Sequence, residues 1–213
     1  NGQLGPDKEP GNQLASVDAR YGFALGNQSM GLYAQMMGED EAGAFPARKS
    51  WLLGTDWTTG LLNTDQQWFL EYTNTTADDF LGDAMPNVTY EHSIYNTGYR
   101  HYGRNMASSF ESDAEAVTLG AWQFFDNGTN LSASLSYAEL NADGRARAST
   151  PDKDSQYFIP ANRQKTGILN LGYSAPFLQG RLALSAQATD KKIELVTGEQ
   201  DQWSASASWT YRF

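Results

Sequence analysis

The sequence contains no cysteine, few basic side chains and no long apolar run. Without cysteine there is neither a thiolate zinc site nor a cysteine nucleophile. Lys and Arg total 15 against 25 Asp and Glu, and this net charge of −10 argues against nucleic-acid binding, which needs a basic face. No segment approaches the roughly 18 consecutive apolar residues of a helical membrane span. No secretory signal opens the chain either.

The last eleven residues, WSASASWTYRF, alternate between apolar and polar side chains with the period of a β-strand. One side carries Trp203, Ala205, Ala207, Trp209, Tyr211 and Phe213, and the other carries Ser204, Ser206, Ser208, Thr210 and Arg212. Rings at the margins and small residues in mid-strand are typical of a strand that crosses an outer-membrane bilayer, with its polar face toward a barrel lumen. The alternative, a soluble β-sandwich or lipocalin-like barrel, would carry Val, Ile and Leu toward its core. A mean hydropathy of −0.56 does not distinguish a membrane barrel from a soluble one, because the polar lumen face of membrane strands lowers the average.

Similar alternation recurs along the chain and predicts a total of nine strands. We place them at residues 13–24, 30–39, 47–59, 66–74, 115–125, 129–140, 164–175, 181–190 and 203–213. Between the fifth and sixth, Asp126-Asn127-Gly128 is a strong hairpin signal. The predicted fold is an all-β, transmembrane, antiparallel up-and-down β-barrel.

The lengths of the connections predict the orientation of these strands. The long connections are residues 40–46, 75–114, 141–163 and 191–202, and they alternate with short ones. In outer-membrane barrels the periplasmic turns are short and the extracellular loops long. With Phe213 at the periplasmic end, the first strand therefore starts outside the cell. Because bacterial single-chain barrels have even strand counts, we expect at least one strand upstream and interpret residues 1–213 as the C-terminal part of one barrel domain.

Four stretches carry a more specific signal. They are PGNQLASVDAR (residues 10–20), LYAQMMGEDEAG (32–43), FLEYTNT (69–75) and YEHSIYNTGYRHYGR (90–104). These stretches resemble, in order, the second half of the Wzi family of outer-membrane capsule-assembly proteins. The resemblance implies an 18-stranded barrel, of which this chain would supply half, and a surface lectin that attaches capsular polysaccharide to the cell.

The segment of residues 90–104 is rich in aromatic and basic side chains. Aromatic faces pack on the C–H surfaces of sugars, and forked donors bind hydroxyls or uronate carboxylates. We predict that polysaccharide is bound by Tyr95, Tyr99, Arg100, His101, Tyr102 and Arg104. A second interpretation, compatible with the first, is a plug in residues 75–114 that folds into the lumen, its residues satisfying one another. We predict that the lumen or the plug is stabilised by Asp18, Arg20, Glu39, Glu71, Glu91 and His92. Of these, Glu71 is expected to pair with a lumen cation.

Two other chemistries are conceivable, a metal site and a hydrolase. The triplet Glu39-Asp40-Glu41 could hold a hard cation, but such a run is more often a solvated loop or a partner for lumen arginines, so we predict no metal and no cofactor. For a hydrolase, Ser108 or Ser109 would have to approach His92, with Asp113 as orienter. Nothing in the spacing requires this, and no nucleophile elbow, zincin helix or phosphate loop is present.

We therefore predict a non-enzymatic outer-membrane lectin of a Gram-negative bacterium, with extracellular loops and monomeric when complete. Its predicted partners are capsular or other surface polysaccharide, outer-membrane lipid and lipopolysaccharide, with no nucleic acid. The net charge disfavours long-range attraction of an acidic polymer. Because salt screens exposed charges beyond about 8 Å, a ligand can still be attracted by nearby arginines, namely Arg100, Arg104, Arg145 and Arg147. The alternative is a channel for small solutes or oligosaccharides, because serine-rich lumen faces suit a wet pore; a membrane hydrolase is the third possibility.

Overall fold

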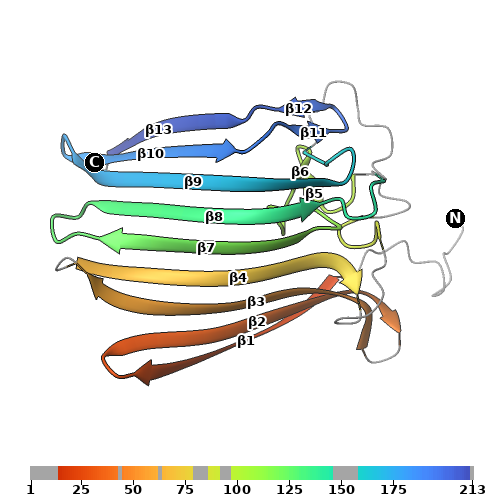
Figure 1. Ribbon diagram of the computed structural model, residues 1–213, viewed down its shortest axis with the longest axis horizontal. Coiled ribbons are helices and arrows are strands. Elements are labelled where there is room, and N and C mark those ends of the chain that lie inside the picture. Colours follow the sequence, from red (N-terminus) through yellow and green to blue (C-terminus); the bar gives the residue numbers. More distant parts are fainter. Residues whose placement is uncertain are drawn as a thin grey trace, which may run out of the picture.

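A computed structural model describes residues 14–42, 45–61, 64–78, 86–91, 97–145 and 158–211. Its main feature is one nine-stranded antiparallel sheet in which each strand pairs with its neighbours in the chain (Figure 1). The strands are β1 (Leu14–Leu25), β2 (Gln28–Ala42), β3 (Phe45–Leu61), β4 (Thr64–Asp78), β7 (Glu115–Phe124), β8 (Asn130–Leu140), β9 (Gln164–Phe177), β10 (Gly180–Thr189) and β13 (Trp203–Tyr211). All nine predicted strands and their up-and-down order are confirmed. In the described residues, β1 and β13 are the two edges of the sheet.

Three predicted connections differ from the structure. We expect a loop at residues 40–46, but β2 extends to Ala42 and β3 begins at Phe45, with Glu39 paired to Arg48 and Ala42 to Phe45. The backbone ladder does not require apolar side chains, so a hairpin can extend beyond the stretch in which alternation is visible. The turn expected at residues 176–180 is reduced to Leu178 and Gln179, whose φ angles of 45° and 60° suit a two-residue hairpin.

The third difference lies in the connection of residues 191–202, which was expected to be a loop. It contains a short hairpin of β11 (Ile193–Leu195) and β12 (Gly198–Gln200). A second small hairpin, β5 (Arg100–His101) with β6 (Arg104–Asn105), lies in the connection between β4 and β7. Figure 1 shows both hairpins at the end of the sheet that is opposite the C-terminus, while the tight turns lie near the C-terminus. The long connections thus lie at one end, which they share with the β2–β3 hairpin, and the other tight turns lie at the opposite end.

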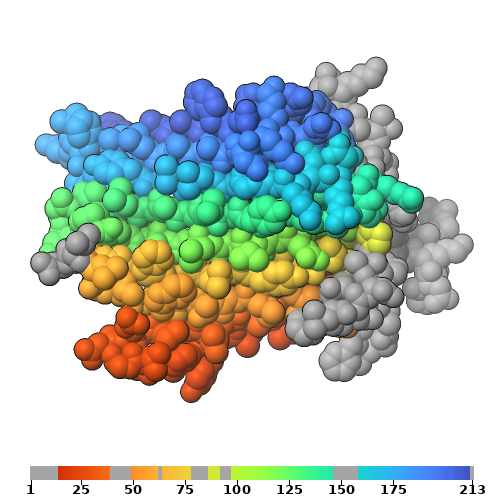
Figure 2. Space-filling model, viewed as in Figure 1, coloured from red at the N-terminus to blue at the C-terminus, as the bar shows by residue number. Residues whose placement is uncertain are grey.

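The two faces of the sheet differ in polarity because each strand alternates and directly paired residues share a face. On the outer face Leu135 lies between Leu119 and Leu169. On the inner face the neighbouring Ser134 lies between Gly120 and Asn170. Figure 2 shows the described strands side by side in chain order over one face, with no second layer of described residues on them.

Large apolar side chains of the outer face are exposed as a consequence. Leu135 is 59% exposed, Trp203 72% and Trp209 51%, which a soluble sandwich would bury in its core. The described residues contain no helix long and apolar enough to cross a membrane.

The inner face carries paired polar groups. Arg20 donates to both carboxylate oxygens of Asp56, at 2.8 and 3.0 Å. The Tyr33 hydroxyl donates to Glu71 at 2.8 Å, lying across Gly54, where any Cβ would meet the tyrosine ring at 2.3 Å. Among the described residues no ion pair joins Glu71 to a cation, and its pairing with a lumen cation stays a prediction. A tyrosine reaches it instead, because the absence of a side chain at position 54 lets the ring cross β3.

Candidate functional site

The connection between β4 and β7 folds back over the inner face. We call its described part, residues 86–91 and 97–114, the plug loop. Its far end is joined to the end of β4, where the Thr75 amide donates to the Ala114 carbonyl at 2.8 Å and the Thr75 hydroxyl donates to the Glu111 carbonyl at 2.9 Å. The Ser50 and Thr89 hydroxyls are 3.0 Å apart and tie the plug loop to β3. The plug loop is thus attached to the wall at several points.

A buried ion triad lies inside the plug loop. The Arg100 guanidinium donates to Glu111 through Nε at 3.0 Å and through Nη2 at 2.8 Å, and it also donates to Glu91. The Arg100 side chain is only 1% exposed. Burial by itself would lower the pKa of Arg100, but the two carboxylates outweigh it and raise that pKa. Arg100 is therefore a fixed positive charge that holds two plug segments together.

A further buried carboxylate, that of Asp113, lies where the plug loop meets the next connection. The Asn87 amide donates to both oxygens of Asp113, at 2.9 and 2.7 Å, and the Asn87 side chain donates to Asp143 at 2.7 Å. The Asp113 carbonyl accepts from the Ala142 amide at 2.7 Å. Burial raises the pKa of Asp113 to about 6, although the Asn87 amide lowers it, and the charges of Asp143 and Glu91 raise it further.

This raised pKa predicts a pH-dependent plug loop. A carboxyl with a higher pKa in the folded state binds its proton more tightly when folded, so it favours the folded plug at about pH 4 and loses that effect as pH rises through about 6. We expect the free energy of opening the plug loop, measured by hydrogen exchange corrected for intrinsic rates, to fall by about 2 kcal/mol between pH 4 and pH 7. Asp113→Asn keeps an acceptor for the single Asn87 amide and should flatten the profile. Equal pH dependence in both proteins would contradict this assignment.

An apolar cluster packs the plug loop against the β11–β12 hairpin. It consists of Ala114, Ala116, Ala138, Leu140, Ile193 and Leu195, with Phe110 and Phe158 packed on it. The residues of β11 thus cover the inner face at β7 and β8. The Phe158 amide donates to the Gly103 carbonyl at 3.0 Å, and the Val196 amide donates to the Ile159 carbonyl at 3.0 Å. We call the plug loop, residues 158–163 and the β11–β12 hairpin together the loop cap.

Four of the predicted binding residues are exposed on the plug loop, and three of them, His101, Tyr102 and Arg104, lie together on the β5–β6 hairpin, where they form what we call the exposed strip. Tyr102 is 86% exposed and meets His101 edge-on at 4.3 Å between ring centroids. Tyr99 is 39% exposed. The Arg104 guanidinium carbon lies 3.9 Å from the centre of the Phe158 ring, so a cation–π contact positions this exposed side chain.

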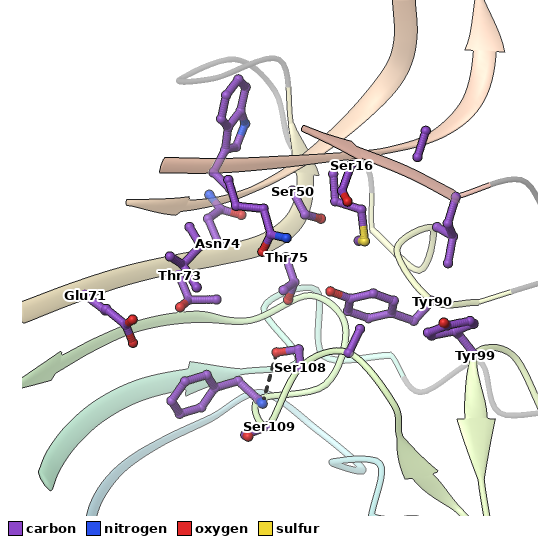
Figure 3. A pocket seen from close by; sticks show the side chains of 18 residues that line it. Ser16, Ser50, Glu71, Thr73, Asn74, Thr75, Tyr90, Tyr99, Ser108 and Ser109 are labelled. Carbon is purple, nitrogen blue, oxygen red and sulfur yellow. Dashed lines mark hydrogen bonds between the residues drawn. The ribbon is translucent and has the colours of Figure 1, made fainter. Parts of the chain in front are cut away.

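Beneath the plug loop lies a cavity of about 520 Å³, bounded by the inner face of β1–β4 (Figure 3). Tyr90 and Tyr99 stack on one side of it, with ring centroids 6.3 Å apart. Ser16, Thr73 and Ser109 bring hydroxyl groups to it from three different elements (Figure 3). The cavity therefore combines aromatic rings with polar groups, a composition that suits hydroxyl-rich ligands.

The family model of the capsule assembly protein Wzi matches residues 1–206. The chain belongs to the Wzi family. A solved structure described as Wzi of Escherichia coli, an outer-membrane protein involved in group 1 capsule assembly and a carbohydrate-binding β-barrel, aligns with a TM-score of 0.72 and 25% identity. The alignment covers 95% of this chain and 42% of that Wzi chain, and a search of curated proteins found no match. The predicted family is confirmed.

The structure groups the predicted residues of this Wzi-family chain differently from the sequence. His101, Tyr102 and Arg104 lie together on the strip, whereas Tyr99 stacks on Tyr90 at the cavity. Arg100 and Glu91 lie in the buried triad, so Arg100 fits the plug interpretation rather than direct contact with glycan. Asp18 and Arg20 line an inner-face cavity of about 570 Å³, together with Glu71. Tyr95, His92 and the side chain of Glu39 lie outside the described residues.

Sequence reasoning missed several residues of this Wzi-family site. Phe158 lies in a polar connection with no alternation, so nothing in the sequence indicated that it supports Arg104. Ser16 and Thr73 were interpreted only as strand residues, yet the plug loop makes them part of a cavity. Glu111 and Asp113 belong to a stretch with no regular period, and only folding shows them as buried partners.

Proposed function

We propose that this chain forms part of the wall and the loop cap of an outer-membrane barrel that binds capsular polysaccharide and attaches it to the cell surface. The exposed strip on the plug loop carries this proposal. An exposed aromatic ring beside a positioned arginine offers both a packing face and forked donors to a sugar, and Tyr102 is 86% exposed close to Arg104. Family membership supports it, because the solved Wzi of Escherichia coli is described as binding carbohydrate.

The same proposal places the chain in the outer membrane of a Gram-negative bacterium. The apolar outer face would contact lipid, and the loop cap would face the exterior beside lipopolysaccharide. The separation of tight turns from long connections supports this orientation, because periplasmic turns are short in such barrels. Nine strands in a chain that matches 42% of the solved Wzi support the interpretation that this chain is one part of a larger barrel.

The test removes the strip and leaves the plug intact. Tyr102→Ala combined with Arg104→Ala, in the complete protein, is expected to lower retention of surface polysaccharide at least about tenfold, because aromatic and arginine anchors each contribute more than 1 kcal/mol at such sites. Cell-bound and released polysaccharide would be compared by immunoassay. Lys192→Ala is the control, since Lys192 is an exposed cation of the same loop cap that pairs with Glu199. Unchanged retention in the double variant would reject the strip as the binding surface.

A small-solute channel is the second candidate, favoured by the polar inner face. The Thr118 and Ser136 hydroxyls are 2.8 Å apart, as are those of Ser185 and Ser206, so hydroxyl pairs follow the wall. The loop cap opposes it, because the apolar cluster covers part of that wall. Planar-bilayer recordings separate the two: a closed trace favours the capped lectin, and a steady open current favours the channel.

A further inference from the structure

The cavity beneath the plug loop has the dimensions and surface of a ligand site. Its volume of about 520 Å³ lies within the range of roughly 300–1,000 Å³ that is usual for small-molecule sites. The stacked rings of Tyr90 and Tyr99 provide an apolar side, and Phe110 adds a third ring to the lining. Figure 3 shows serine and threonine side chains surrounding the same space.

Several of these hydroxyl groups are available to a ligand. Among the described residues, Ser16, Thr73 and Ser109 have no hydrogen-bond partner for their side chains, whereas Ser50 and Thr75 are already paired. Unpaired hydroxyls that face a polar cavity can donate to and accept from sugar hydroxyls in equal measure. The arrangement therefore favours a ligand rich in hydroxyl groups.

The charge of the cavity distinguishes between classes of sugar. Of its described lining residues, Glu71 is the only one with a charged side chain. The Tyr33 hydroxyl donates to one oxygen of Glu71 and holds this carboxylate on the wall. The guanidinium of Arg100 is engaged with Glu91 and Glu111, so the nearby plug offers it no compensating cation. Arg20, which lines the neighbouring inner-face cavity together with Glu71, is bonded to Asp56. A uronate would therefore meet the negative charge of Glu71 here.

We propose that this cavity binds a neutral sugar residue of the surface polysaccharide and discriminates against uronates through Glu71. The inference rests on the proposed function, because the cavity lies directly beneath the plug loop that presents the exposed strip. It adds a second site with its own selectivity: packing on the exposed part of Tyr99, which Tyr90 supports from its buried side, hydrogen bonds to Thr73 and its neighbours, and repulsion of carboxylates. Like charges a few ångströms apart in a partly desolvated site repel strongly enough for at least about tenfold selectivity.

Calorimetric titration of the complete protein in detergent tests the proposal, with maltotriose as the neutral probe and trigalacturonate as the acidic one. Maltotriose is expected to bind at least about tenfold more tightly. Glu71→Gln keeps an acceptor for Tyr33 and should reduce the ratio of the two affinities about tenfold. Glu115→Gln removes the same charge on the opposite face and should leave the ratio at its wild-type value. Thr73→Val should weaken maltotriose binding about threefold to tenfold through the loss of one hydrogen bond.

Three results would overturn the proposal: tighter binding of trigalacturonate, an unchanged ratio in Glu71→Gln, or no binding of either probe. None of them affects the retention assay on Tyr102 and Arg104. If the double variant lost retention and any of these results were found, the proposed lectin function would be kept and only the neutral-sugar site would be rejected. Unchanged retention together with selective maltotriose binding would reject the strip as a binding surface and support the cavity as a sugar site.

Discussion

Replacing Arg100 with alanine is expected to lower the free energy of opening the plug loop by about 3–5 kcal/mol. This is the usual loss of stability when one partner of a buried ion pair is removed. The loss is large because Glu91 and Glu111 would remain buried without a cation, and the Arg100 side chain is itself only 1% exposed. Hydrogen exchange of residues 97–114 in the complete protein measures the change directly. Planar-bilayer conductance gives a second readout, since a released plug loop should increase current.

Two variants control this experiment. Arg100→Lys keeps the charge but not the forked geometry that bonds both carboxylates, so we expect an intermediate loss. Arg104→Ala removes an exposed arginine of the same loop and should cost no more than about 1 kcal/mol. If Arg100→Ala and Arg104→Ala opened the plug loop equally, the triad would not be what stabilises it.

The second large effect is expected on the outer face. Leu135→Arg should destabilise the barrel by about 2–4 kcal/mol, the cost of a cation near the middle of a lipid-facing strand. Leu135 is at mid-strand on β8, is 59% exposed and lies between two further leucines. Unfolding of the complete protein by urea in lipid bilayers, followed by the heat-modifiable shift in gel migration, measures the difference.

Ser134→Arg is the matched control for this substitution. Ser134 is the adjacent residue and therefore lies on the inner face, where a long cation can reach polar groups or water. We expect a much smaller loss of stability. If the serine variant were the more damaging of the two, the assignment of inner and outer faces would be reversed and the membrane placement would fail.

The strands were predictable because their signal is local. In Trp203–Tyr211 each second residue is serine or threonine, and this alternation by itself assigns the two faces of β13. The hairpin signal at Asp126-Asn127-Gly128 likewise gave the β7–β8 turn, where Gly128 has a φ of 79°. The β2–β3 hairpin was predicted too short, because its polar end has no apolar alternation to mark it.

The candidate site was only partly predictable. The aromatic and basic composition of residues 90–104 correctly indicated a segment of interest, and the plug interpretation predicted that some of its residues would satisfy one another. Composition could not separate Arg100 from Arg104, which are four positions apart in one loop. One is enclosed by Glu91 and Glu111, and the other lies exposed over Phe158.

The sequence by itself determined the sheet: its strands, their order, their two faces and the family to which they belong. These properties follow from period-two alternation and from short motifs, which depend on neighbouring residues alone. Only the tertiary structure decided which arginine is buried, which hydroxyls line a cavity and which loops join in the loop cap. Those outcomes depend on contacts between residues such as Gly103 and Phe158, which are far apart in the chain and obey no period.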